Sequence, residues 1–167
     1  MKKTNMLRIG AVLWLCSVSF QSVAADVLAV RTISLDLARD IASATIKECR
    51  KMGYQTSAVV VDRNGLLRVA MRDDLAARFT LQIAEEKANA VIMSGVNSSE
   101  FRKNRADIKE ELNHVDGLII MAGGVQILAG GNYIGAVGVS GAPGGDLDEA
   151  CAVQALKSFE ERLEFAD

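Results

Sequence analysis

Apolar residues recur at helical spacing in some parts of the chain and gather in short β-forming runs in others, which divides it into helices and strands. Between residues 34 and 52 they recur every three or four positions, as on the buried face of an amphipathic helix. Ser34 is suited to cap the start of this helix and Gly53 its end. The same spacing predicts three further helices, at residues 80–94, 98–112 and 147–165.

Short runs rich in β-forming residues lie between these helices, at residues 56–61, 66–71, 117–122, 125–129 and 133–139. Asn64-Gly65 is a tight hairpin turn between the first two runs, and Gly-Gly pairs separate the last three. Because short turns join every neighbouring pair except the second and third, we predict one five-stranded antiparallel sheet. Helices packed on this sheet would give an α+β fold.

The first 25 residues have the pattern of a signal peptide. A basic start precedes an apolar run over residues 9–20, and Val23-Ala24-Ala25 is a small-residue cleavage site. The run is shorter than the about 20 residues that a membrane span needs. We therefore expect residues 1–25 to be removed. Residues 26–167 would then form one periplasmic or secreted domain without a membrane span.

Charge narrows the range of partners. Of the 19 basic and 21 acidic residues, three basic ones lie in the expected signal peptide. The remaining domain is therefore more acidic than the formal charge of −2 for the whole chain. Because binding to a phosphate backbone needs a basic surface, nucleic acid is not an expected partner.

Cys49 and Cys151 remain after removal of the signal peptide. An oxidising compartment would permit a disulfide that joins the first and last helices. The alternative, which the sequence slightly favours, is two small buried apolar residues on helix faces. The spacing does not decide between them, since a bridge depends on the distance between the two Cα atoms.

Two segments carry a family resemblance. GGVQILAGGNYIGAVGVSGAPGGDLDEACA (123–152), together with AEEKANAVIMSG (84–95), resembles the haem-binding HbpS/GlcG-like family, also called domain of unknown function 336. It is also similar to the C-terminal domain of the PduO adenosyltransferases. The resemblance implies a profilin-like α-β-α sandwich, a homo-oligomer, and binding of haem or a related tetrapyrrole. For some members it also implies haem degradation or an iron-binding accessory role.

The chain departs from the family pattern at two positions near these segments. Asp74 stands where glycine is usual, and Asn89 stands where threonine is usual. Members of the family do not all ligate haem iron through the same residue, so the resemblance assigns no iron ligand here.

Three single residues are candidates for ligand chemistry. His114 is the only histidine, and haem iron commonly takes a histidine as axial ligand. The alternative is a surface histidine near a helix C-terminus. Lys87 would bind a propionate, a small carboxylate or an oligomer partner, or would lie on a solvated helix face. Asp73 would contribute to a cation site, or would be a turn residue.

The bend at Ser140-Gly141 is a further candidate, because its backbone amides would form a donor-rich surface for an anion. The acidic residues Asp146, Asp148 and Glu149 follow at once and would repel an added anion. The bend therefore has two interpretations, a ligand site and a purely structural helix start.

These observations give one leading hypothesis and two alternatives. The leading hypothesis is an exported protein that binds haem or a related tetrapyrrole, with haem degradation or an iron-binding accessory role. The first alternative is a binding module for a small metabolite without haem. The second is an oligomeric interaction protein without enzymatic activity.

Overall fold

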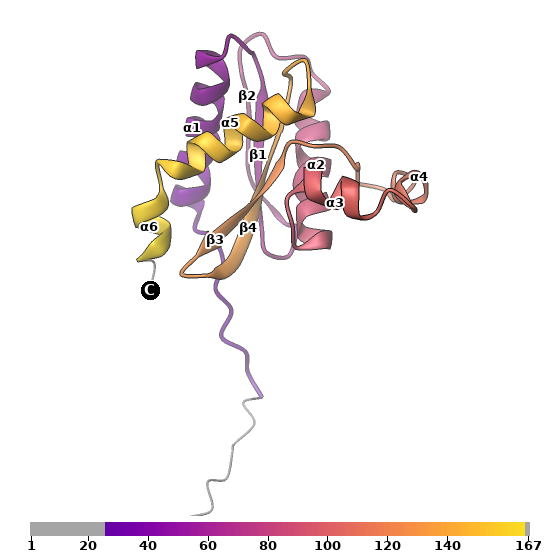
Figure 1. Ribbon diagram of the computed structural model, residues 1–167. Coiled ribbons are helices and arrows are strands. Elements are labelled where there is room, and N and C mark those ends of the chain that lie inside the picture. The colour runs from indigo at the N-terminus through magenta and orange to yellow at the C-terminus, as the bar shows by residue number, and fades with distance from the viewer. Residues whose placement is uncertain (1–25, 166–167) are drawn as a thin grey trace, which may run out of the picture.

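The computed structural model describes residues 26–165, which form a sheet with helices on both faces (Figure 1). The predicted signal peptide, residues 1–25, lies outside the described residues. The elements are α1 (Leu35–Lys51), β1 (Ser57–Asp62), β2 (Leu67–Arg72), α2 (Thr80–Ser94), α3 (Ser98–Asn104), α4 (Lys109–Leu112), β3 (Gly124–Ala129), β4 (Asn132–Ser140), α5 (Gly145–Lys157) and α6 (Glu160–Glu164). None of the described helices has the length and apolar character needed to cross a bilayer.

The strands pair in the order β2-β1-β4-β3, and every pair is antiparallel. All six residues of β1 are buried, as expected for an inner strand covered on both faces, whereas β2 is an edge strand with mostly exposed side chains. The predicted mixture of helices with an antiparallel sheet is confirmed, but the predicted number of five strands is wrong.

The strand predicted over residues 117–122 is missing because the outer edge of β3 is already occupied. The backbone amide of Gly124 donates to Ser98 Oγ at 2.8 Å, and that of Gln126 donates to Asn97 Oδ1 at 3.0 Å. A fifth strand would need these same donors. The apolar residues Leu118 and Ile120 of this segment are buried instead against Ala90, Phe101 and Leu112.

Two predicted helices are each divided in the structure. The helix predicted over 98–112 breaks between α3 and α4, where Arg105 leaves helical geometry and its side chain pairs with Asp107. The helix predicted over 147–165 breaks after α5, where Ser158 donates its hydroxyl to the carbonyl of Ala155. At the second break, the hydroxyl of Ser158 thus pairs with a carbonyl that a continuous helix would pair through its backbone.

The helices α1 and α5 cover one face of the sheet, and α2 covers the other (Figure 1). A disulfide between Cys49 in α1 and Cys151 in α5 joins the two helices of the first face, with the Cα atoms 5.2 Å apart. The interpretation of these cysteines as unlinked apolar residues, which the sequence slightly favoured, is therefore wrong. The spacing of the cysteines in the sequence does not show that α1 and α5 lie side by side.

On the other face, α2 lies so close to the sheet that two strand positions have no room for a side chain. A Cβ atom on Gly138 of β4 would overlap the carbonyl oxygen of Ala84, and it would lie 2.8 Å from the amide nitrogen of Ala88. A Cβ atom on Gly124 of β3 would overlap the carbonyl oxygen of Lys87. These glycines therefore set the distance between helix and sheet.

This close approach generates the first prediction. Replacing Gly138→Ala should lower the free energy of unfolding by about 2 kcal/mol or more, because a methyl group must displace helix backbone from a packed core. Urea unfolding followed by circular dichroism would measure the loss. Ala70→Val, at an exposed position of β2, is the control and should change stability little. A Gly138→Ala protein as stable as the wild type would show that α2 tolerates a wider spacing.

The disulfide generates a second prediction. It closes a segment of 102 residues, so its loss should lower the free energy of unfolding by about 2–5 kcal/mol, mainly by relaxing a constraint on the unfolded chain. The measurement is the urea midpoint with and without a reductant. The double variant Cys49→Ala/Cys151→Ala should unfold at the lower midpoint under both conditions. An unchanged wild-type midpoint after verified reduction would contradict the prediction.

Candidate functional site

Lys87, a predicted ligand-binding residue, points from α2 into the protein and is 1% exposed. Its ammonium group donates to Asp148 Oδ2 at 2.7 Å and to the backbone carbonyl of Val139 at 2.9 Å. Asp148 is also buried, and this burial raises the pKa of its carboxyl group, against the opposing effect of the Lys87 charge. Lys87 therefore joins α2 to the end of β4 and the start of α5.

The bend at Ser140 and Gly141 lies next to this ion pair, between Val139, which contacts Lys87, and Ala142, which contacts Asp148. Asp148 Oδ1 accepts a hydrogen bond of 2.9 Å from the backbone amide of Ala142. The anion that the bend was predicted to attract is thus supplied by the protein itself, with Lys87 as its counterion. The structure brings Lys87, Ser140 and Gly141 together, and the Lys87 ammonium group and the Ala142 amide already have partners there. A ligand role for them remains a prediction.

Asp73 lies elsewhere, after β2, and its side chain is fully buried. Arg50 of α1 donates to both of its carboxylate oxygens, with Nε at 2.8 Å from Oδ2, and these hydrogen bonds lower the pKa of Asp73. Its Oδ1 also accepts from the amide of Asp74 at 2.8 Å. A cation at Asp73, which also remains a prediction, would have to displace the Arg50 guanidinium.

His114 is the one predicted site residue that lines an open cleft. It follows α4, in the segment that leads to β3, and its side chain is exposed. The cleft has a volume of ≈ 560 Å³, within the usual range for small-molecule sites. It is lined by one residue each from α2, α3 and α4 and by the segment after α4, namely Glu86, Arg102, Lys109 and residues 113–121.

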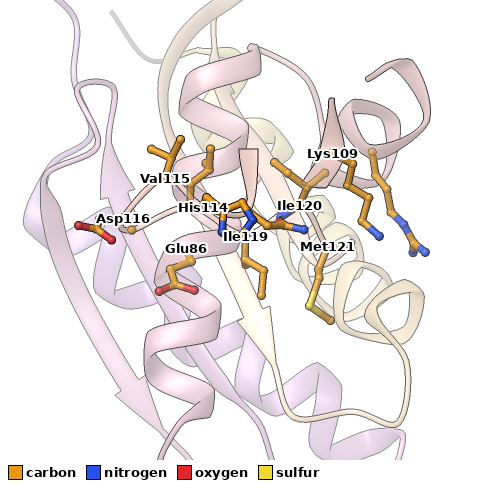
Figure 2. Close-up of a pocket in the computed structure, with 12 residues that line it drawn as sticks. Glu86, Lys109, His114, Val115, Asp116, Ile119, Ile120 and Met121 are labelled. Carbon is orange, nitrogen blue, oxygen red and sulfur yellow. The ribbon is translucent and has the colours of Figure 1, made fainter. Parts of the chain in front are cut away.

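The charges of the cleft are separated. In the view of Figure 2, the carboxylates of Glu86 and Asp116 lie on one side of His114 and the ammonium group of Lys109 on the other. Apolar side chains of the same segment lie between and around them, including Ile119 and Met121. Such a surface fits a flat apolar molecule that carries an anionic group at one end.

Several of the polar groups in the cleft have no partner within the protein. Across residues 26–165, the side chains of Arg102, Lys109, His114 and Asp116 make no hydrogen bond or ion pair. Glu86 differs, because it accepts a hydrogen bond of 2.9 Å from Gln82. Two unpaired cations and an unpaired imidazole in one cleft are available to bind a ligand.

Sequence reasoning identified His114 but not Arg102 or Lys109. A usable signal was the basic residues, four in all, on the polar helix predicted before the only histidine of an acidic chain. Helix periodicity alone does not show that Arg102 and Lys109 line the same cleft as residues 113–121, since this depends on the break between α3 and α4. No group of three or more metal-binding side chains occurs within the described part of the chain.

Comparison with known proteins gives the same family from sequence and from structure. The family model described as "Haem degrading protein HbpS-like" matches residues 33–157. The crystal structure of HbpS is 33% identical, with a TM-score of 0.74 over 81% of this chain and 98% of that chain. No curated protein sequence is significantly similar.

Two further solved structures share the fold. The Klebsiella pneumoniae protein ORFY, of the domain of unknown function 336, is 27% identical, with a TM-score of 0.75 over 83% of this chain and 98% of that chain. The complex of PduOC with haem is 18% identical, with a TM-score of 0.66 over 76% of this chain and 94% of that chain. At 18% identity, the PduOC complex supports the fold alone.

The buried ion pair generates a third prediction. Lys87→Met should lower the free energy of unfolding at pH 7 by about 3–5 kcal/mol, because it leaves the Asp148 carboxylate buried without a counterion. Burial then raises the pKa of Asp148 in the folded state only. The folded state therefore binds the proton more tightly, and the variant should gain stability as the pH falls from 7 towards 5.

Urea unfolding of Lys87→Met at several pH values measures this effect. The double variant Lys87→Met/Asp148→Asn is the control, because its amide keeps an acceptor for Ala142 but carries no charge. It should recover part of the stability and lose the gain on acidification. If Lys87→Met responded to pH as the double variant does, Asp148 would not be the titrating group.

Proposed function

The chain belongs to the haem-degrading HbpS-like family, and from this premise we propose that it is an exported protein that binds haem or a related tetrapyrrole in the cleft around His114. The observation that carries the proposal is the unpaired imidazole of His114 beside two unpaired cations and apolar side chains. The family supports haem as the class of ligand, and the unpaired groups of the cleft support it as the binding site.

The residues of the cleft fit a haem in three respects. His114 provides a nitrogen ligand of the type that haem iron commonly takes. Arg102 and Lys109 would pair with the propionates, which are carboxylates. Ile119 and Met121 would contact the apolar ring face, and sulfur–aromatic contacts favour the methionine. Because haem carries its own iron, this role does not require a group of several metal-binding side chains in the protein.

Bound haem would supply a redox-active iron, which is the chemistry that a haem-degrading or iron-releasing protein needs. The contributions of this chain's own residues are binding and orientation. The basic side of the cleft would fix the propionate end, while the carboxylates of Glu86 and Asp116 would disfavour the reversed orientation through like-charge repulsion.

The disulfide supports the proposed export. Cys49 and Cys151 are both fully buried and bridged, and such structural bridges persist in oxidising compartments. This agrees with the signal peptide predicted for residues 1–25. Assembly into a homo-oligomer is proposed from the family resemblance.

A binding module for a small metabolite is a second candidate. Arg102 and Lys109 favour it, because unpaired cations would bind a small dicarboxylate without any tetrapyrrole. Thermal shift measurements with hemin, metal-free protoporphyrin and small dicarboxylates would separate the two candidates. Stabilisation by the dicarboxylates alone would favour the second.

The fourth prediction concerns haem binding. Titration of the purified protein with hemin should shift the Soret band, and His114→Ala should abolish the spectrum of the histidine-ligated iron. Removing both cations in Arg102→Ala/Lys109→Ala should weaken binding by about tenfold or more while leaving the ligation spectrum unchanged, since two charge-assisted pairs are lost.

Lys103→Ala is the matched control for the cation variant. Lys103 is an exposed lysine of α3 that does not line the cleft, so its removal should leave hemin affinity unchanged. A His114→Ala protein with the wild-type spectrum and affinity would refute the cleft as the haem site.

A further inference from the structure

The segment that carries His114 contains no regular secondary structure, although it forms much of the cleft wall. Residues 113–117 form turns, and all five are exposed. Gly117 adopts a left-handed φ of 79°, which reverses the chain before Leu118 and Ile120 enter the protein. Such a segment positions a side chain well only when other groups restrain it.

One restraint is internal to the segment. The side-chain oxygen of Asn113 accepts a hydrogen bond of 2.8 Å from the backbone amide of Ile120. Because Ile120 is fully buried, this bond ties the start of the loop to a fixed point. His114 is the next residue after Asn113, so the imidazole projects from the restrained end. Asn113 serves here as an acceptor.

The second restraint comes from α2. The side-chain amide of Asn89 donates to the carbonyl of Gly117 at 3.0 Å. The carbonyl accepts only, so Asn89 must present its nitrogen, and its own oxygen is then buried without a partner. An unpaired buried oxygen is unfavourable, and this cost accompanies the hydrogen bond that Asn89 donates to Gly117. Asn89 serves as a donor.

We infer that Asn113 and Asn89 are positioning residues for His114, and that they act with opposite hydrogen-bond polarity on the two ends of one loop. The expected effect of the two asparagines on haem binding rests on the proposed function. The geometry of the two restraints stands on the hydrogen bonds alone, so it is testable without any ligand.

Opposite polarity gives a sharp experiment, because the same substitution should have opposite results at the two positions. Asn113→Asp keeps an oxygen acceptor for the amide of Ile120. Asn89→Asp places a carboxylate against the carbonyl of Gly117 and should repel it. Asn113→Ala and Asn89→Ala remove each bond outright. Asn132→Ala is the control, since Asn132 donates to the carbonyl of Gly130 at 3.1 Å in a distant turn.

The first readout is amide hydrogen exchange of residues 113–121 in the ligand-free full chain. Exchange should accelerate in Asn113→Ala, Asn89→Ala and Asn89→Asp, and should stay at the wild-type rate in Asn113→Asp and Asn132→Ala. Acceleration in Asn113→Asp, or wild-type protection in Asn89→Asp, would overturn the assigned polarity. Circular dichroism of each variant confirms that the fold is retained.

The second readout is hemin affinity together with the ligation spectrum. Loss of a group that orients an iron ligand typically weakens metal binding by about 10–100-fold, and this is expected for the three accelerated variants alone. Equal hemin affinity in all variants would overturn the positioning role. If the wild-type chain bound no hemin, the proposed function would fail, while the exchange pattern would still decide whether the two asparagines hold the loop.

Discussion

The close contact between α2 and the sheet is the constraint on which the other features depend. Gly138 and Gly124 leave no space between helix backbone and strand, and this brings the buried end of Lys87 to the carbonyl of Val139 and to Asp148. One ion pair thereby joins α2, β4 and α5 at the end of the sheet. A wider spacing would leave both charges buried without partners, at a cost of several kcal/mol for each ion.

The same contact determines which face of α2 is buried against the sheet and which face is left to line the cleft. Because Lys87 points into the protein, its neighbour Glu86 points outward and lines the cleft around His114. On the same helix, Asn89 reaches the loop that carries His114. The position of α2 against the sheet thus fixes the buried Lys87–Asp148 ion pair on its inner face. It also fixes Glu86 and Asn89 on its outer face. The Gly-rich segment of β4 matters for the cleft through this spacing and not through direct contact.

The sequence predicted those features that depend on local pattern. Helical periodicity located α1 and α2, and β-forming runs between turn signals located four of the strands. This pattern-based prediction failed at residues 117–122, where the run is apolar but Leu118 and Ile120 pack against helices and not against a strand. It also missed the Cys49–Cys151 bridge and the joint contribution of Arg102 and Lys109, because both depend on how distant segments meet.

The contrast between Lys87 and His114 shows why residue type alone does not identify a site. Both were candidates on chemical grounds, one as a cation for a carboxylate and the other as an iron ligand. In the structure, Lys87 already holds a carboxylate, that of Asp148, whereas the imidazole of His114 has no partner among the described residues. A polar group already paired inside the protein must give up that partner to bind a ligand. An unpaired group at a cleft gives up only water, and this difference favours the His114 cleft as the binding site.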